Sequence, residues 1–384
     1  MTQLHVAEPA DYPVLLLFGH VDGNTPAGVS HSLESIKGCP NPDQPIPCAM
    51  TSNTSVRLAR RPVGLPVADD FRIDTSEVPT PGPGQVLVRV TLISLDPAMR
   101  GWLDDRPSYL PPIGLDEVIR AGGVGEVVAS SDPRFPVGSM VQGNTGVQEY
   151  AVLDASGLTR VDPALGTASM YLGVLGMTGM TAYFGLFEHG RPRAGDTVLV
   201  SAAAGAVGSI AGQLARINGC RVVGVAGGPD KCSYVTDGLG FDAAVDYKVD
   251  SLRAAISNAC PNGIDVYFDN VGGAVLNAAL ANLSMHARIV ICGAISQYNA
   301  EQATPGPSNY MALLVRRATM TGFLVFDHAA EFRTARRRLA QWVADGQLTA
   351  PETLVPGSVA DFHSVFLRLF TGDNVGKLIL DISA

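Results

Sequence analysis

The sequence predicts an α/β protein in which a doubly wound parallel sheet is inserted into a partly open β-barrel domain. Three observations predict this fold class. The chain has a strand-and-turn pattern from about residue 55 to 153, and alternates between strands and helices from about residue 168. A glycine-rich turn joins the first strand of the alternating part to a helix. The last strand-like run, Val375–Asp381, is expected to return to the first domain.

Composition favours a soluble protein with a large core. Of the 384 residues, 46% are hydrophobic and 16% are charged, which excludes disorder of the whole chain and suits two domains. The net charge of -9 and the lack of a basic block disfavour nucleic acid and membrane surfaces as partners. No apolar run approaches the roughly 18 residues of a transmembrane helix. With no secretory signal at the N-terminus, a cytoplasmic location is expected.

The domain organisation follows from changes in pattern along the chain. Pro, Gly, Asn, Asp and Ser recur without period before residue 54, so residues 1–50 are expected to form a loosely ordered extension. Met50 directly precedes the first domain-like stretch, and a start site there is an alternative hypothesis. Residues 51–170 and 338–384 are expected to form a catalytic domain. Residues 171–337 are expected to form the nucleotide-binding domain between them.

The barrel-like part is predicted from short strands separated by Pro and Gly. The turn cluster Pro79–Gly84 precedes Gln85–Leu92, whose side chains alternate between polar and apolar with period two. Val124–Val128 and Val147–Val152 are further short strands of this kind. Such a composition is typical of a partly open β-barrel.

The inserted part is predicted from six apolar runs separated by helical patterns of about 10 to 15 residues. Strand and helix in alternation indicate a parallel sheet covered on both faces. The basic amphipathic run Glu331–Val343 is the expected last helix. The six predicted strands are Thr197–Ser201, Arg221–Ala226, Ala244–Tyr247, Ile264–Phe268, Arg288–Cys292 and Met320–Phe326.

The strongest single signal is the glycine-rich turn that follows Thr197–Ser201. Ala202, Gly205 and Gly208 are spaced so that the backbone can approach a pyrophosphate and the helix can pack closely on the strand. The helix N-terminus supplies N–H donors, among them those of Ala206, Val207 and Gly208, and a positive dipole. The alternative is a small-residue turn without a ligand.

The end of the second predicted strand indicates which dinucleotide binds. An NAD site usually has Asp or Glu about 20 residues after the glycines, whereas Val225–Gly228 carries no acid. Lys231 follows Gly228, and Tyr247-Lys248 end the third strand nearby. A cation without a carboxylate favours the 2′-phosphate of NADPH. Asp230 opposes this reading unless it caps the next helix, and Lys231 could simply face solvent.

These segments resemble the prostaglandin reductase, 2-alkenal reductase and curcumin reductase group of zinc-independent medium-chain dehydrogenases. The resemblance covers residue 55 to the C-terminus and implies a Rossmann sheet inserted into a GroES-like catalytic domain. Its motifs are the glycine-rich turn, Ser94–Gly101, Leu172–Tyr183, Gly228–Cys232, Tyr267–Gly273, Gly293–Asn299, Gly322–Asp327 and Asn374–Lys377.

The resemblance implies hydride transfer from NADPH to the β-carbon of an α,β-unsaturated ketone or aldehyde. Tyr298 matches the tyrosine that holds the substrate oxygen or the cofactor ribose. A phenol suits the first role because its O–H can stabilise a developing oxyanion, and water is the alternative proton donor. The resemblance further implies that cofactor contacts come from Thr181, Asn270, Gly272, Ser296 and Asn374, in addition to Gly228, Lys231 and Tyr247.

One departure from the family concerns the substrate pocket. Relatives often carry a tyrosine at the position of Ala98, so alanine is expected to enlarge or reshape the pocket. Tyr109, Phe323 and Val325 are candidates for the pocket lining, and ordinary packing is the alternative for each of them.

Metal-dependent chemistry is disfavoured by the sequence. The region where a zinc alcohol dehydrogenase carries its catalytic cysteine reads Asp96-Pro97, and Gly122–Gly125 contains no histidine. No cysteine cluster has the spacing of zinc ligands. We therefore expect no metal.

Two alternatives to an enone reductase stay open at this point. An NADPH:quinone oxidoreductase is the nearest enzymatic alternative, and a non-catalytic NADPH-binding protein on the same fold is the other. A homodimer is expected from the resemblance, through the apolar segment Met320–Phe326.

Overall fold

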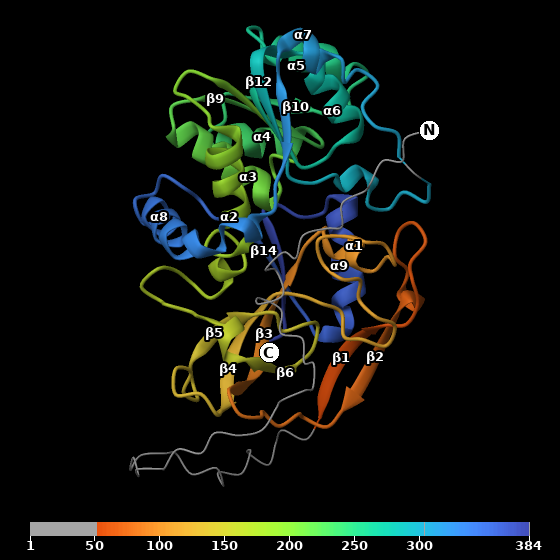
Figure 1. Ribbon diagram of the computed structural model, residues 1–384, viewed down its shortest axis with the longest axis vertical. Helices are drawn as coiled ribbons and strands as arrows, with labels where there is room; N and C mark the ends of the chain where they lie inside the picture. Colours follow the sequence, from red (N-terminus) through yellow and green to blue (C-terminus); the bar gives the residue numbers. More distant parts are fainter. Residues whose placement is uncertain (1–51, 303, 384) are drawn as a thin grey trace, which may run out of the picture.

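The computed structural model describes residues 52–302 and 304–383. The expected extension of residues 1–50 and the start-site hypothesis at Met50 lie outside the described residues. Two sheets occupy opposite halves of the molecule, and the chain passes from one half to the other and back (Figure 1). The predicted fold class is confirmed.

The first half is built on a seven-stranded sheet of order β14-β15-β3-β4-β5-β7, with β6 paired to β3. Strand β3 is central because its apolar residues are buried on both faces. It pairs antiparallel with β15, so the C-terminal strand does return to this half of the molecule. The strands are β3 (Gln85–Leu95), β4 (Gly123–Ser130), β5 (Met140–Gly143), β6 (Tyr150–Asp154), β7 (Thr159–Arg160), β14 (Glu352–Pro356) and β15 (Lys377–Asp381).

Smaller elements close this half around the sheet. A hairpin of β1 (Asn53–Leu58) and β2 (Phe71–Ser76) packs beside it. The aromatic side chains of α9 (Phe362–Thr371) stack on one another and on Phe71 of the hairpin. The remaining short elements are η2 (Ala68–Asp70), α1 (Met99–Trp102), η3 (Ala155–Gly157), η4 (Ser169–Tyr171) and η9 (Val359–Asp361).

The second half is a six-stranded parallel sheet of order β10-β9-β8-β11-β12-β13. The predicted runs form its strands, with shifted ends in four of the six. The strands are β8 (Thr197–Ser201), β9 (Arg221–Ala226), β10 (Ala243–Asp246), β11 (Ile264–Asp269), β12 (Leu283–Ile291) and β13 (Thr319–Gly322).

Two predicted strands differ from the structure for physical reasons. Strand β12 begins at Leu283, before the predicted Arg288, because Leu283 pairs with Ile264 ahead of an irregularity in which His286 has a φ of 62°. The polar, exposed residues of that irregularity conceal the strand pattern. Strand β13 ends at Gly322, where its pairing with β12 ends. The predicted continuation is wrong from Phe323 on, since Phe323 and Leu324 lie outside any strand and Val325–Glu331 forms the 3₁₀ helix η8.

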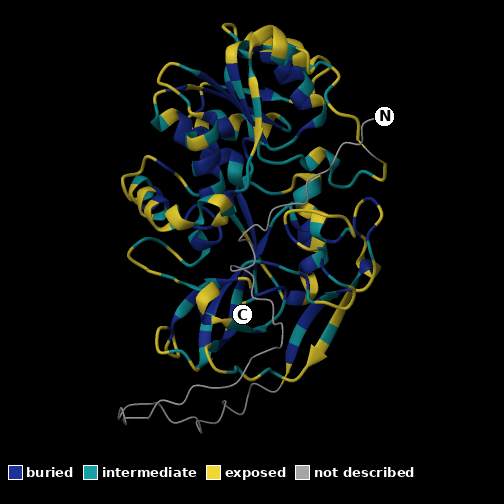
Figure 2. Ribbon diagram, viewed as in Figure 1, coloured by how far each residue is buried: buried dark blue, intermediate teal, exposed yellow. Residues whose placement is uncertain are grey.

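Strands β8, β9 and β11 in the middle of the parallel sheet are largely buried (Figure 2), and a separate core lies on each face of the sheet. Val198 and Val200 join the core that α2, α3 and α8 cover, and Leu199 joins the core under α5 and α6. The helical elements of this half are α2 (Met177–Phe184), η5 (Gly185–Gly190), α3 (Ala206–Ile217), α4 (Pro229–Ser233), η6 (Tyr234–Gly238), α5 (Leu252–Ala259), α6 (Gly273–Leu280), η7 (Ile295–Gln297), α7 (Ala312–Arg316) and α8 (Phe332–Ala344).

Helix α8 crosses the expected domain boundary between residues 337 and 338. Ala335 lies before that boundary and Leu339 and Ala340 after it, and all three pack into the same core of the parallel sheet. We therefore propose Ala344 as the end of the nucleotide-binding domain, and the other domain limits stay predictions.

A hydrogen-bonded histidine pair joins η5 to η8. The Nε2 atoms of His189 and His328 are 3.3 Å apart, and the two rings stack on Phe323 and Phe184 respectively. Burial, reinforced by His328 and Arg191, lowers the pKa of His189. The folded protein therefore binds a proton at this site less tightly than the unfolded chain does.

This pair predicts a loss of stability in mild acid. The free energy of unfolding is expected to fall as the pH drops below about 6.5, the ordinary histidine value, because the unfolded chain takes up the proton first. Thermal unfolding of His189→Gln between pH 7 and 5 should show a weaker pH dependence than the native protein. His286→Asn, at an exposed position, is the control and should match the native slope. An equal pH dependence of thermal unfolding in all three proteins would show that His189 does not cause the loss of stability in acid.

Candidate active site

The glycine-rich turn between β8 and α3 has the shape of a phosphate cradle. Ala202 adopts a φ of 50°, and the N–H of Gly205 donates to the carbonyl oxygen of Ala202 at 2.8 Å. A β-carbon at position 208 would overlap that same oxygen, so only glycine allows α3 to begin this close to the turn. The N–H groups of Ala206, Val207 and Gly208 lie in the first turn of α3, where a helix offers them no partner. The turn can therefore bind an anion.

A cavity of ≈ 550 Å³ lies beyond the ends of β9 and β10. It contains the predicted cofactor residues Gly228 and Lys231. Burial lowers the pKa of Lys231, while Asp373 across the cavity opposes that shift. The remaining lining residues come from both halves of the molecule and are Gly227, Pro229, Asp230, Lys248, Thr353, Gly372, Asp373, Asn374 and Val375.

The acidic residues beside this cavity differ in their roles. Asp246 accepts hydrogen bonds from the N–H groups of Gly228 and Lys248, both at 3.0 Å, and these bonds lower its pKa. Its carboxylate therefore joins the loop after β9, which leads to Lys231, to the loop after β10, which carries Lys248. The expectation that Asp230 caps α4 is wrong, because Gly228 is the N-cap and Asp230 lies exposed in the first turn. The predicted contact residue Tyr247 covers Gly227 with its ring.

The sequence reasoning missed the buried carboxylate that organises the end of β11. Asp269 is 1% exposed, and its Oδ1 atom accepts hydrogen bonds from the Tyr267 hydroxyl (2.7 Å), the Ser201 hydroxyl (3.1 Å) and the N–H groups of Val271 and Gly272 (2.9 Å each). The signal was an acid directly after the apolar run of β11. This carboxylate fixes the turn that follows β11 next to the glycine-rich turn.

The predicted cofactor residues after β11 and β12 are held against one another. The Asn270 side chain donates to the carbonyl oxygen of Ser201 at 2.7 Å, which ties the end of β11 to the end of β8. Gly272 has a φ of 69°, and a β-carbon there would lie 3.3 Å from that of Ala294. The Ser296 hydroxyl donates to the carbonyl oxygen of Val271 at 2.6 Å. The loops thus meet at the carboxyl edge of the sheet, where ligands bind in such folds.

Tyr298 belongs to a cluster of phenol and thiol groups at this edge, in which Tyr298 and Cys292 are half-buried and Tyr109 is 40% exposed. Its hydroxyl oxygen accepts a hydrogen bond from the Ala294 N–H at 3.2 Å. Burial raises the pKa of Tyr298 and of Tyr109, and the nearby Cys292 adds to both shifts. Burial also raises the pKa of the Cys292 thiol to about 12. All three groups therefore stay protonated at neutral pH.

The predicted pocket residues divide between this cluster and the core. The Tyr109 ring lies 6.5 Å from that of Phe326, which the sequence reasoning did not select. Ala98 precedes the short helix α1 and is half-buried. Phe323 packs on His189, and Val325 lies in the hydrophobic core. A pocket role for these last two stays a prediction.

Two further predicted cofactor residues lie on elements beside the turn. The Thr181 hydroxyl donates to the carbonyl oxygen of Met177 within α2. The Asn374 side chain donates to the carbonyl oxygen of Gly376, and Asn374 lines the cavity that holds Lys231.

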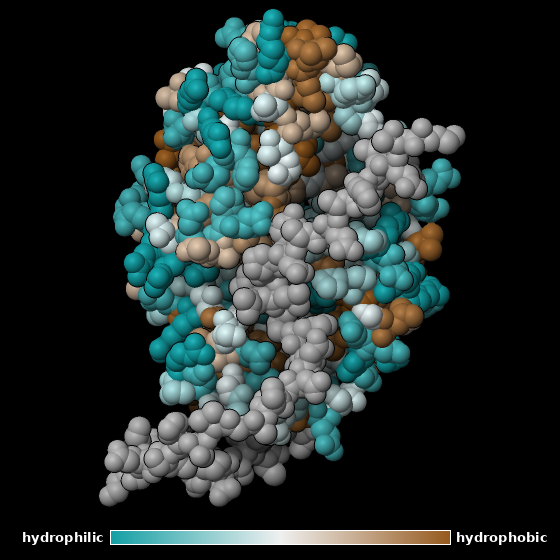
Figure 3. Space-filling model, in the orientation of Figure 1, coloured by the Kyte–Doolittle hydropathy of each residue, from teal (hydrophilic) through white to brown (hydrophobic). Residues whose placement is uncertain are grey.

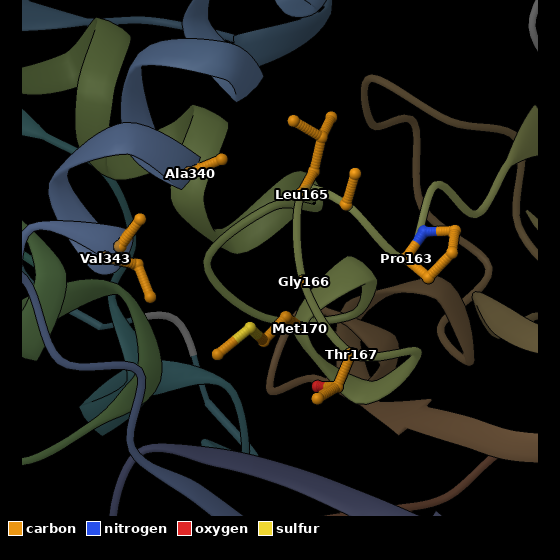
Figure 4. A pocket seen from close by; sticks show the side chains of 9 residues that line it. Pro163, Leu165, Gly166, Thr167, Met170, Ala340 and Val343 are labelled. Carbon is orange, nitrogen blue, oxygen red and sulfur yellow. The ribbon is translucent and has the colours of Figure 1, made fainter.

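A separate open hollow of ≈ 400 Å³ lies between residues 163–170 and α8, lined by Leu165, Met170 and Val343 among others (Figure 4). Its lining includes none of the residues that the sequence predicts for the site.

Comparison with known proteins identifies the family. The family described as the N-terminal domain of oxidoreductase matches residues 54–161, and the zinc-binding dehydrogenase family matches residues 206–341. The chain is 40% identical over 331 residues to the NADPH-dependent curcumin reductase of Escherichia coli, covering 85% of this chain and 96% of the relative. It is 38% identical over 338 residues to the NADP-dependent 2-alkenal reductase of Nicotiana tabacum, covering 86% and 98%.

The chain belongs to the zinc-independent group of the medium-chain dehydrogenase/reductase family. The crystal structure of CurA from Vibrio vulnificus in complex with NADPH superposes with a TM-score of 0.81 at 41% identity, covering 86% of this chain and 99% of that one. Within residues 52–302 and 304–383, no group of three or more His, Cys, Asp or Glu side chains could hold a metal ion. Among the helices of that same part, none is long and apolar enough to cross a membrane.

Asp269 gives a prediction for stability. Asp269→Ala leaves the buried N–H groups of Val271 and Gly272 without an acceptor and should lower the free energy of unfolding by about 3 kcal/mol. Asp269→Asn retains a carbonyl oxygen at the same place and should lower it by less. Urea denaturation of the two variants measures the difference. Equal losses would show that the charge of Asp269, rather than its accepted hydrogen bonds, stabilises the turn.

Proposed function

We propose that this protein is an NADPH-dependent reductase of the C=C bond of α,β-unsaturated ketones or aldehydes. The observation that carries the proposal is that a protonated phenol, Tyr298, lies at the same sheet edge as a dinucleotide cradle. The relatives named for curcumin and for 2-alkenals support the substrate class, since a 2-alkenal is an α,β-unsaturated aldehyde. A cytoplasmic location stays a prediction.

The residues present fit NADPH. At the cradle, a β-carbon at position 208 would overlap the carbonyl oxygen of Ala202, and the N-terminus of α3, with its unpaired N–H groups, begins at Gly205. Lys231 and Lys248 line the cavity at the end of β9, where an NADH site would carry an acid. Asn270, Gly272, Ser296 and Asn374 would hold the remainder of the cofactor, with Thr181 and Tyr247 beside them.

Bound NADPH supplies the hydride that adds to the β-carbon of the substrate. The electrons of the C=C bond then move toward the carbonyl oxygen, which gains negative charge. The protonated Tyr298 phenol can donate a hydrogen bond to that oxygen without prior charge, which stabilises the enolate. Tyr298 or a water molecule then provides the proton for the α-carbon. Ala98 leaves space for the part of the substrate beyond the carbonyl.

Turnover assays distinguish this reaction from its alternatives. The loss of reduced-nicotinamide absorbance should be fast with NADPH and a medium-chain 2-alkenal or enone, and the product should be the saturated carbonyl compound. Reaction with a quinone alone would establish a quinone reductase instead. Tight NADPH binding without turnover of any of these would favour a non-catalytic protein. Tyr298→Phe should lower kcat by roughly 100- to 1,000-fold, because single donors to a developing oxyanion contribute at this scale.

Cofactor choice gives a separate prediction. Lys231→Ala should lower the ratio of kcat/KM with NADPH to that with NADH by about 10- to 100-fold, since a charge-assisted bond to a 2′-phosphate contributes roughly 1.5–3 kcal/mol. Steady-state kinetics with both cofactors measures the ratio. Arg253→Ala, an exposed cation on α5 outside the cavity, should leave it unchanged. A ratio that Lys231→Ala does not alter would remove Lys231 from cofactor selection.

We also propose a homodimer that forms through the edge strand β13 and helix α7. Strand β13 lies at the edge of the parallel sheet and is largely exposed. Beside it, Tyr310, Met311, Leu314 and Val315 are 50–68% exposed and form an apolar patch over α7 (Figure 3). An apolar patch beside an open strand edge is typical of an interface between subunits.

Light scattering tests the dimer. The native protein should give twice the 40.1 kDa mass of one chain, and Leu314→Asp should shift it toward the monomer because a charge would be buried at the interface. Val63→Asp, at a 78% exposed apolar position in the other half, is the control. A native protein that is monomeric at micromolar concentration would contradict the proposal.

A further inference from the structure

A buried lysine lies between the two halves of the molecule and has no part in the mechanism described above. Lys377, the first residue of β15, is 2% exposed. Its Nζ atom donates to the carbonyl oxygen of Leu95 at 2.9 Å and to Oδ1 of Asp96 at 2.5 Å. Burial lowers the pKa of Lys377, and the Asp96 carboxylate opposes that shift. A buried ammonium group without such a partner would be strongly destabilising.

The carboxylate that Lys377 holds belongs to the loop that leads into the substrate pocket. Oδ2 of Asp96 accepts a hydrogen bond from the Ser94 hydroxyl, so both oxygens of the carboxylate have a defined partner. The carbonyl oxygen of Asp96 accepts from the Met99 N–H at 3.0 Å, which begins α1 directly after Ala98. The Asp96 side chain is 39% exposed and adds to the raised pKa of Tyr109. Asp96 thus lies between Lys377 and the phenol cluster.

The backbone before Lys377 is attached to the cofactor cradle. The N–H of Gly376 donates to the carbonyl oxygen of Ala204 at 2.8 Å, and Gly376 forms a parallel bridge with Gly205. Gly376 has a φ of 65°, and a β-carbon there would overlap the carbonyl oxygen of Pro351. Gly376 therefore contacts the cradle through its peptide N–H, and the adjacent Lys377 contacts the pocket loop through its side chain.

The surroundings of Lys377 are built to accommodate a charge. Glu352 of β14 lies opposite Lys377 in the strand pairing, and its Oε1 atom is buried without a hydrogen-bond partner. Burial raises the pKa of Glu352, while Ser169 and Lys377 oppose that shift. Gly173 packs against the pair, since a β-carbon there would be in van der Waals contact with Oε1 of Glu352 at 3.4 Å and with Cβ of Lys377 at 3.6 Å.

We propose that Lys377 is a positioning residue, which through Asp96 holds the pocket loop Ser94–Arg100 in register with the cofactor cradle. The inference rests on the proposed function, because it concerns the alignment of the substrate with the hydride donor. Loss of the Lys377–Asp96 bond frees the loop while the bond from Gly376 to the cradle persists. Substrate alignment is then lost and cofactor binding is retained.

The variant Lys377→Met removes the charge and keeps the length of the side chain. Its kcat is expected to fall by roughly 10- to 100-fold and its KM for the enone to rise, since small misplacements have effects of this size. Its Kd for NADPH should stay within about twofold of the native value. Asp96→Ala should give the same kinetic pattern, with a lower free energy of unfolding because it leaves the buried ammonium group of Lys377 without its carboxylate partner. The kcat of the double variant should be no lower than that of either single variant, because both residues act through one bond.

Fluorescence provides a readout that does not depend on turnover. Trp102 lies in α1 and donates to the Tyr109 hydroxyl at 3.3 Å. In a Trp342→Phe background, acrylamide quenching of Trp102 should increase about twofold in Lys377→Met. Arg89→Met is the matched control, because it removes an exposed ion pair with Glu126 from the same strand β3 and should change none of these values.

The outcomes separate the two proposals. Native protein without turnover of any enone, combined with the expected quenching change, would reject the proposed function and support the coupling of Lys377 to the loop. Unchanged quenching and unchanged kinetics in Lys377→Met would reject the positioning role. The positioning role would also be rejected if the fold-decrease in kcat of the double variant equalled the product of the two single fold-decreases.

Discussion

The hydrogen bond from the Gly376 N–H to the carbonyl oxygen of Ala204 connects the two halves of the molecule at the point where they share a site. Strand β15 pairs with β3 in the mixed sheet, while the residue before it is bridged to the glycine-rich turn of the parallel sheet. The cradle, the cavity that holds Lys231 and the phenol cluster all lie along this junction. Their relative positions therefore depend on how the chain enters β15, which is why a glycine with positive φ is required at position 376.

Buried polar groups determine the shape of the site, and each one is held by contacts from more than one element. Asp269 accepts four hydrogen bonds with one oxygen and joins the turns after β8 and β11. Lys377 joins β15 to the loop after β3. Burying such groups is unfavourable unless their partners are fixed. Apolar packing alone would tolerate many arrangements of the loops. The need to pair each buried polar group with a hydrogen-bond partner selects one of them.

Local patterns predicted the parts of the fold that local interactions determine. The run from Thr197 to Ser201 followed by Ala202, Gly205 and Gly208 specifies a strand, a turn and a helix within about 20 residues, and the structure has all three there. Asp269 follows an apolar run that is visible in the sequence, but its burial and its hydrogen bond from Ser201 depend on the packing of a neighbouring strand. The pair of Asp96 and Lys377 is separated by 281 positions. The strand predicted to reach Phe326 ended early because its pairing partner ends at Ile291.

The cofactor end of the site consists of other groups than the substrate end. This difference explains why the sequence predicts the cofactor end better. The cofactor end consists largely of backbone N–H groups and glycines, whose geometry leaves few alternatives, so its residues recur in a recognisable pattern. The proposed substrate end consists of side chains on loops, such as Ala98 and Tyr109, which can change without disturbing the sheet. A reductase of this construction can keep one cofactor while its pocket changes. In the proposed positioning role, the Lys377–Asp96 bond keeps this loop aligned with the cradle.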